Sequence, residues 1–306
     1  MKHLLWIALF GTLTSLASQQ NNSNNFVGIQ QWAKDFYIGA ASGTVGMTVY
    51  APFHYAQNRR IQRLGILLNK QAQLSAPKSL QANIKQIMSG SRALIFGKVP
   101  AIAIQQAGYA GIIRKLESEG TAASETEKLG ANITAAIFSA PVANASQLVA
   151  LHQENQKEKC NILKTIHSFP RGYKDLSRGL GPVMVRETLF MLIFNQLLPK
   201  VKNETQKITN DEAMAYLISA PIAGALVTGC TQPANVNVTY LHADIAQKKY
   251  KGFWSFMDAY HAMKSKGIVA ESFRGTGLRA PGVMLGLAAM NKAKEEMLSA
   301  QNNVKL

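Results

Sequence analysis

The chain has 306 residues and carries 33 Lys or Arg against 17 Asp or Glu, so its formal net charge is +16. This surplus indicates an anionic partner or an anionic membrane surface. Nucleic acid is the competing interpretation, but the basic residues are scattered between apolar stretches and no nucleic-acid motif accompanies them, so we expect no nucleic-acid partner.

Cysteine and histidine usage argues against metal and enzyme chemistry. Cys160 and Cys230 are the only cysteines, which disfavours a disulfide framework and provides no metal-ligand spacing. The 6 histidines form no evident nucleophile or metal constellation. We therefore expect no metal, no cofactor and no enzymatic activity.

The first 25 residues resemble a secretory signal peptide in composition. A basic start at Met1–His3 precedes an apolar run, and a polar spacer follows, with a cleavage site expected after Ala17. A seventh, peripheral helix is the alternative interpretation. We exclude residues 1–25 from the repeat described next.

Six apolar windows follow, several of them close to the ~20 residues that a helix needs to cross a bilayer. The windows are residues 37–56, 94–113, 129–151, 180–199, 213–230 and 276–293. In the first window Gly39, Gly43 and Gly46 share one helix face, which favours close helix packing in a membrane. A flexible glycine stretch in a soluble protein is the alternative.

Proline and glycine recur in step along these windows. Prolines end the first, third and fifth at intervals of 89 and 92 residues, and a glycine follows each proline 38 to 45 residues later. The prolines are Pro52, Pro141 and Pro233, and the glycines are Gly97, Gly179 and Gly275. The period predicts three repeats, residues 30–120, 125–205 and 210–300, with a proline kink in the first helix of each.

This joint spacing resembles the mitochondrial carrier family. Residues 172–197 are similar to that family's fourth helix, and residues 250–282 to its third matrix helix plus sixth helix. The likeness covers residues 30–300. It implies an all-α membrane protein: a threefold pseudo-symmetric bundle of six transmembrane helices with short matrix-side amphipathic helices, acting as a monomer in the mitochondrial inner membrane.

The chain departs from the family signature Pro-x-acid-x-x-base, whose charges close the matrix gate. The acid and base positions hold His54 and Gln57, Ala143 and Ser146, and Asn235 and Val238. The three prolines remain, but the ring of ion pairs is absent. Gln57, Ser146, Asn235 and His54 could hydrogen-bond in its place.

The opposite gate of the family lies at the far ends of the even-numbered helices. The resemblance places Glu117, Lys202 and Glu295 at its charged positions and implies a pair between Glu117 and Lys202. Ordinary solvated helix ends are the alternative. Surface ion pairs contribute only ~0–1 kcal/mol, so such a gate would open readily.

Arg186 and Glu187 lie inside the fourth window, where ionisable residues are costly and mark a transport pathway. The resemblance implies that they contact substrate, and an Arg followed by an acid there is similar to carriers of zwitterionic, amino-acid-like substrates. An intramembrane ion pair that locks the bundle is the alternative. Gln105 and Gly282 hold the equivalent positions on the second and sixth helices, and Arg279 could add a positive charge.

Two tripeptides resemble the family's cardiolipin-binding turn, in which helix N-terminal amides bind a lipid phosphate. Phe273-Arg274-Gly275 matches it fully and Ser177-Arg178-Gly179 in part. Membrane lipids, cardiolipin among them, are therefore expected partners.

The leading hypothesis is a carrier that exchanges a small charged metabolite, amino-acid-like or another carboxylate, through one central site. A nucleotide carrier is the first alternative, favoured by the net charge and by Gly282-Val283, which resembles an adenine contact. Such a nucleotide carrier could be a bacterial mimic that acts in host mitochondria. A degenerate carrier fold that serves as a membrane scaffold or insertion factor is the second, favoured by the missing ion pairs.

Overall fold

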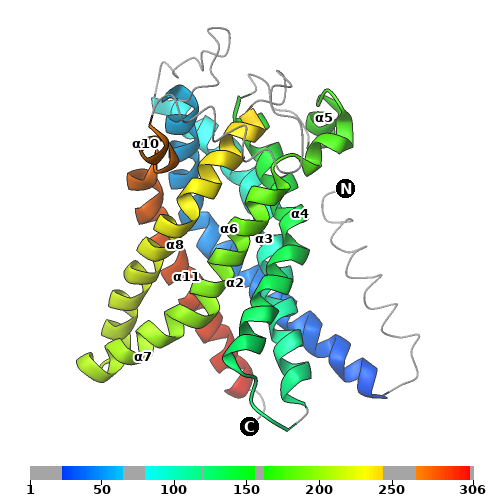
Figure 1. Ribbon diagram of the computed structural model, residues 1–306, viewed down its shortest axis with the longest axis vertical. Coiled ribbons are helices and arrows are strands. Elements are labelled where there is room, and N and C mark those ends of the chain that lie inside the picture. The colour runs from blue at the N-terminus through cyan, green and yellow to red at the C-terminus, as the bar shows by residue number, and fades with distance from the viewer. Residues whose placement is uncertain (1–22, 65–79, 119, 156–161, 244–266, 304–306) are drawn as a thin grey trace.

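The computed structural model describes residues 23–64, 80–118, 120–155, 162–243 and 267–303, which are almost entirely helical and contain no strand (Figure 1). The all-α prediction is confirmed for this part of the chain. Most of the signal-like segment and most of the expected third matrix helix, residues 250–266, lie outside it.

The long helices are α2 (Ser23–Leu64), α3 (Leu80–Glu117), α4 (Glu125–Asn155), α6 (Leu180–Leu192), α7 (Leu198–Thr209), α8 (Glu212–Ala243) and α11 (Thr276–Asn303). A π-helical turn, η3 (Ile193–Leu197), joins α6 to α7, and the short elements are α5 (Ile162–His167), the 3-10 helix η2 (Gly172–Ser177) and α10 (Ile268–Ser272). Every apolar window of the sequence falls within these long helical segments.

The long helices other than α7 form a closed ring. In chain order α2 contacts α3, α3 contacts α4, α4 contacts α6, α6 contacts α8, and α8 contacts α11, which returns to α2. Two further contacts cross the ring, from α8 to α2 and from α8 to α4. In Figure 1 the segments stand side by side along the long axis of the molecule, and they spread apart towards the lower end.

Glycines allow the ring helices to approach closely. A Cβ on Gly46 would lie 2.8 Å from the Gly286 carbonyl oxygen of α11, and one on Gly43 would lie 3.1 Å from Ile102 of α3. Added Cβ atoms on Gly97 and Gly282 would overlap their neighbours across the α3–α4 and α11–α2 contacts. The packing role predicted for the glycine-rich first window therefore agrees with the structure.

Only two of the three recurring glycines hold equivalent places in the structure. Gly179 and Gly275 directly precede α6 and α11 at φ values of 78° and 81°, a left-handed conformation that favours glycine. Gly97 instead lies in the middle of α3 and packs against Ser146. Gly97 therefore does not begin a helix as Gly179 and Gly275 do.

Prolines lie inside the helices as the repeat predicts, but not only in the first helix of each repeat. Pro52, Pro141 and Pro233 are within α2, α4 and α8, while Pro100 lies in α3 and Pro281 in α11. Each removes one backbone donor from its helix.

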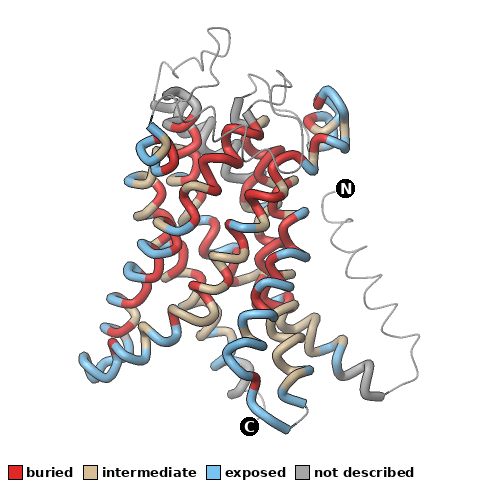
Figure 2. The backbone as a smooth tube through the Cα atoms, viewed as in Figure 1, coloured by how far each residue is buried: buried red, intermediate tan, exposed pale blue. Residues whose placement is uncertain are grey.

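The outer surfaces of α4 and α8 are apolar, whereas polar side chains face inward. Exposed apolar residues recur at helical spacing on both helices: Leu129, Ile133, Ile137 and Phe138 on α4, and Met214, Ile218, Ile222 and Leu226 on α8. Within the part of the chain described, residues Glu125–His152 and Met214–His242 are long and apolar enough to cross a membrane, with mean hydropathies of 1.3 and 1.5. Figure 2 shows the buried residues on the inner side of the helices. These features indicate a membrane protein.

We expect Gly97→Ala to destabilise the fold by about 1–3 kcal/mol, because the new methyl group overlaps Ser146 across the α3–α4 contact. Exchanging the two small residues, as Gly97→Ser with Ser146→Gly, should recover part of this loss, because the new Cβ still lies 2.9 Å from the Cα of residue 146. Thermal unfolding in detergent measures both effects. Gly229→Ala is the control, since its Cβ meets nothing within 4 Å; an equal loss there would contradict the packing explanation.

Candidate functional site: a charged cavity inside the helix ring

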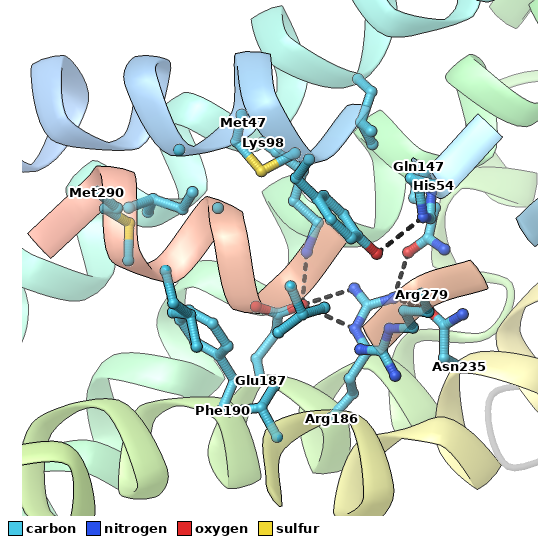
Figure 3. Close-up of a pocket in the computed structure, with 18 residues that line it drawn as sticks. Met47, His54, Lys98, Gln147, Arg186, Glu187, Phe190, Asn235, Arg279 and Met290 are labelled. Atoms are coloured by element: carbon cyan, nitrogen blue, oxygen red, sulfur yellow. Dashed lines mark hydrogen bonds and ion pairs between the residues drawn. The ribbon is translucent and has the colours of Figure 1, made fainter. Parts of the chain in front are cut away.

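A cavity of about 100 Å³ lies inside the ring, because every ring helix contributes at least one lining residue. The lining comprises Gly46, Met47, Tyr50 and His54 of α2; Leu94, Lys98 and Ile102 of α3; Gln147 of α4; Arg186, Glu187 and Phe190 of α6; Val227 and Asn235 of α8; and Arg279, Val283, Gly286, Leu287 and Met290 of α11. Figure 3 shows their side chains converging on one space.

Glu187 is the centre of the charged cluster. Its Oε1 lies 2.6 Å from Lys98 Nζ of α3 and 2.5 Å from Arg186 Nη2, and its Oε2 accepts a hydrogen bond of 2.9 Å from Gln105 Nε2. Each of the charged side chains is largely buried. One carboxylate thus satisfies two cations in a setting where either cation alone would be costly.

Arg186 also ties α6 to two other helices. Its Nη1 donates to Gln147 Oε1 of α4 and, at 3.1 Å, to Asn235 Oδ1 of α8. Its Nε donates to Glu187 Oε1 at 3.0 Å. Arg186 and Glu187 therefore bond each other, as the locking interpretation predicts, and also line the cavity, as the substrate interpretation predicts.

Arg279 is the cation of the cavity lining that has no described carboxylate partner. It is only 5% exposed, its Nη1 donates to Gln232 Oε1 at 3.0 Å, and a further side-chain hydrogen bond joins it to Tyr50. Its buried Nε has no hydrogen-bond partner among the described residues, and none of their carboxylates forms an ion pair with it. The lining therefore contains three cationic side chains and one carboxylate, which gives it a positive balance.

The predicted substrate residues do not all reach the cavity. Gln105 does not line the cavity but donates a hydrogen bond to Glu187, which does. Gly282 packs against Phe53 instead of lining the cavity. The sequence reasoning missed Lys98 and its ion pair with Glu187. Lys98 is the single charged residue in window 94–113, so the rule that selected Arg186 would also have found it.

Amide side chains join the helices near the crossing point of α8 with α2 and α4. Gln57 Nε2 donates to Gln232 Oε1 at 3.2 Å, and Gln232 Nε2 donates to the Arg274 carbonyl at 2.6 Å. On the other side Asn144 Nδ2 donates to the Arg178 carbonyl at 3.0 Å, and Asn144 Oδ1 lies 3.1 Å from His242 Nε2. Neutral hydrogen bonds thus link the proline-bearing helices.

Only part of the expected gate set takes part in these links. Gln57 bonds across the ring as expected, but Ser146 donates to the Ala143 carbonyl of its own helix. His54 bonds Tyr50 and Asn58 within α2, and Asn235 bonds Arg186 in the cavity. The sequence reasoning missed Gln232, Asn144 and His242, because it considered only the signature positions.

At the opposite end of the helices, Lys202 of α7 forms a bridge to two others. Its Nζ lies 2.8 Å from Glu295 of α11 and 3.0 Å from Glu212 of α8, and it sits 4.7 Å from the centre of the Tyr216 ring. Burial lowers the pKa of Lys202, but the bonds and charges of the two glutamates outweigh it and raise the pKa above its usual value. Lys202 therefore stays charged at neutral pH.

Lys202 and Glu295 are thus paired with each other, while no described ion pair includes Glu117. The expected Glu117–Lys202 pair is wrong. The reason is the course of α7, which leads Lys202 to α8 and α11 instead of towards α3.

The two lipid-binding turns differ from expectation. Arg178 is only 3% exposed, so its guanidinium is not presented to a lipid headgroup, and Gly179 is buried beside His242. Arg274 is ion-paired with Glu271, which also accepts a 2.8 Å hydrogen bond from the Tyr240 hydroxyl. Gly275 packs against Gln57.

Metal chemistry has no candidate site among the described residues, where no three His, Cys, Asp or Glu side chains could hold an ion. The cavity residues could instead bind and orient an anion through charge-assisted hydrogen bonds.

No protein-family model matches the chain. A curated relative, mitochondrial substrate carrier family protein W of Dictyostelium discoideum, is 24% identical to it over 170 residues. The match covers 52% of this chain and 50% of that protein, so the chain spans about half the length of the relative. The chain is similar to a mitochondrial substrate carrier. The match leaves the substrate open, and the apolar outer faces of α4 and α8 agree with a membrane protein.

We expect Glu187→Gln to destabilise the protein by about 3–5 kcal/mol, because it leaves Lys98 and Arg186 buried without their shared carboxylate. Lys98→Met should have a smaller effect, below about 2 kcal/mol, since Glu187 keeps Arg186 and Gln105. Thermal unfolding in detergent compares them. Glu204→Gln, in the exposed pair with Lys207, is the control and should change little. A larger loss for Lys98→Met than for Glu187→Gln would contradict this order.

Proposed function

We propose that the protein is a transmembrane carrier of the mitochondrial-carrier type, which moves a small charged metabolite through one central site by alternating access. The observation that carries the proposal is the cavity inside the closed ring, with a buried charged cluster built from several helices. Charges in the interior of a membrane bundle are costly and usually serve a pathway. We further propose that the ring has threefold pseudo-symmetry and that its six helices α2, α3, α4, α6, α8 and α11 all cross the bilayer, with η3 extending α6.

The contacts on either side of the cavity are weak enough to separate. On one side the links are neutral hydrogen bonds such as Gln57–Gln232, each contributing about 1 kcal/mol. On the other side the Lys202–Glu295 bridge is partly exposed and contributes ~0–1 kcal/mol. Substrate binding could therefore shift the balance between two conformations, provided that it stabilises an intermediate occluded state.

We propose the mitochondrial inner membrane as the location, a monomer as the working unit and membrane lipids as partners. The similarity to a mitochondrial substrate carrier supports the location. The turn at Gly275, directly before α11, remains the proposed lipid contact, while burial makes the turn at Gly179 a weaker candidate. We propose neither enzymatic activity nor nucleic-acid binding.

One observation favours a second candidate function, a membrane scaffold that no longer transports. Arg186 is fully engaged by Glu187, Gln147 and Asn235, which suits a lock between helices. Arg279 distinguishes the two functions, because its unpartnered buried Nε serves a ligand better than it serves a lock.

Uptake into proteoliposomes tests the proposal. Vesicles with the purified protein should accumulate at least one labelled compound from a panel of amino acids, carboxylates and nucleotides, above protein-free vesicles. Arg279→Ala should lower that uptake about tenfold or more, as expected when a charge-assisted bond worth ~1.5 kcal/mol is lost.

Lys207→Ala, on the exposed face of α7, is the matched control and should transport normally. Absence of uptake for every compound would favour the scaffold. Unchanged uptake by Arg279→Ala would show that the cavity is not the pathway.

A further inference from the structure

The cavity has a charged side and an apolar side. Along α11, Arg279 is followed on the same face by Val283, Leu287 and Met290. The glycine contacts show that α2 runs antiparallel to α11, since Phe53 lies at Gly282 and Gly46 at Met290. Both helices therefore change from polar to apolar in the same direction.

Two other helices follow this order. On α6 the charged pair precedes Phe190, and on α8 Val227 lies two turns before Asn235. In Figure 3 Met290 and Phe190 lie on one side of the space, and Gln147, His54 and Asn235 lie on the other. On α3 the order is broken, because Lys98 lies between Leu94 and Ile102, but its charge is already paired with Glu187. A ligand that fills the cavity thus meets Arg279 at one end and mainly hydrocarbon at the other.

The charges specify the polar end of this ligand. Glu187 already receives hydrogen bonds from Lys98, Arg186 and Gln105, so a substrate ammonium group would have to displace a cation to reach it. This weighs against the zwitterionic substrate expected from the sequence. Arg279, by contrast, has a buried Nε without a described partner, and a carboxylate is its natural complement.

The apolar end argues against a second anionic group. Met47, Phe190, Val227, Leu287 and Met290 form this side of the lining, and none of them can compensate a charge. A charged group held there would lose its hydration without replacement. The cavity volume of about 100 Å³ suits a small ligand.

We infer that the site takes a small organic monocarboxylate with an aliphatic body. The carboxylate pairs with Arg279 beside the Lys98–Glu187 pair, and the body contacts Phe190, Met290 and their apolar neighbours. This inference names a substrate class for the proposed carrier and rests on that function only for the transport step.

Four compounds of similar shape test the class: 4-methylpentanoate, leucine, glutarate and 4-methylpentanamide. Binding is measured as the concentration that raises the unfolding temperature of the detergent-solubilised protein. We expect 4-methylpentanoate to act at a concentration at least tenfold below that of the other three. Equal or tighter binding of leucine, glutarate or 4-methylpentanamide, or no binding of any compound, would overturn the inference.

Two variants test the contacts at the two ends of the ligand independently. Val227→Thr keeps the shape of the apolar wall but adds a hydroxyl group, so it should weaken 4-methylpentanoate severalfold and leave acetate unchanged. Arg279→Gln should weaken both. Unfolding temperatures without ligand show whether each variant is folded, and equal weakening of acetate by Val227→Thr would contradict the assignment of the two ends.

Transport is tested separately with labelled 3-methylbutane-1-sulfonate, a permanently charged analogue that does not cross protein-free vesicles. Uptake of this analogue supports the inference and the carrier function together. Selective binding of 4-methylpentanoate without uptake of any anion would leave the site assignment standing and overturn the carrier. Uptake of dicarboxylates or amino acids in preference to the analogue would overturn the inference and leave the carrier.

Discussion

The shared carboxylate of Glu187 is the interaction on which the interior of this protein depends. It neutralises Lys98 of α3 and Arg186 of α6, and Arg186 in turn reaches α4 and α8. Since buried charges are tolerated only when they are paired and hydrogen-bonded, this one group lets four helices meet around a polar space. Because Glu187 pairs with Lys98 and Arg186, Arg279 is the cation that can pair with an anionic ligand.

Much of the helical framework follows from local sequence features, whereas the partners of each side chain do not. Apolar windows and small residues predicted the helices, because length and hydrophobicity are properties of short segments. Arg186 and Glu187 could also be selected from one segment, because ionisable residues inside an apolar window mark a functional site. Whether Lys202 meets Glu117 or Glu295 depends on the course of α7, which sets a contact between segments 93 residues apart. Such contacts are not encoded in any one segment.

Near Gln232, hydrogen bonds of a neutral side chain connect helices where the ion pairs of the Pro-x-acid-x-x-base signature are missing. Its amide accepts from Gln57 and Arg279 and donates to the carbonyl of Arg274, so one uncharged side chain connects α2, α11 and the turn before α11. Amides carry both donors and an acceptor and avoid the desolvation cost of ions. Interpretation of the signature positions alone missed this, since Gln232 lies just before Pro233.

Closure of the ring between α11 and α2 has a consequence for biogenesis. Gly46 and Gly286, which touch across this contact, are 240 residues apart in sequence. A ribosome must therefore synthesise α11 before the cavity has its last wall, because α11 contributes Arg279, Val283 and Met290 to the lining. Insertion of α11 between α8 and α2 is therefore the step that closes the ring around the buried charges of Lys98, Glu187 and Arg186.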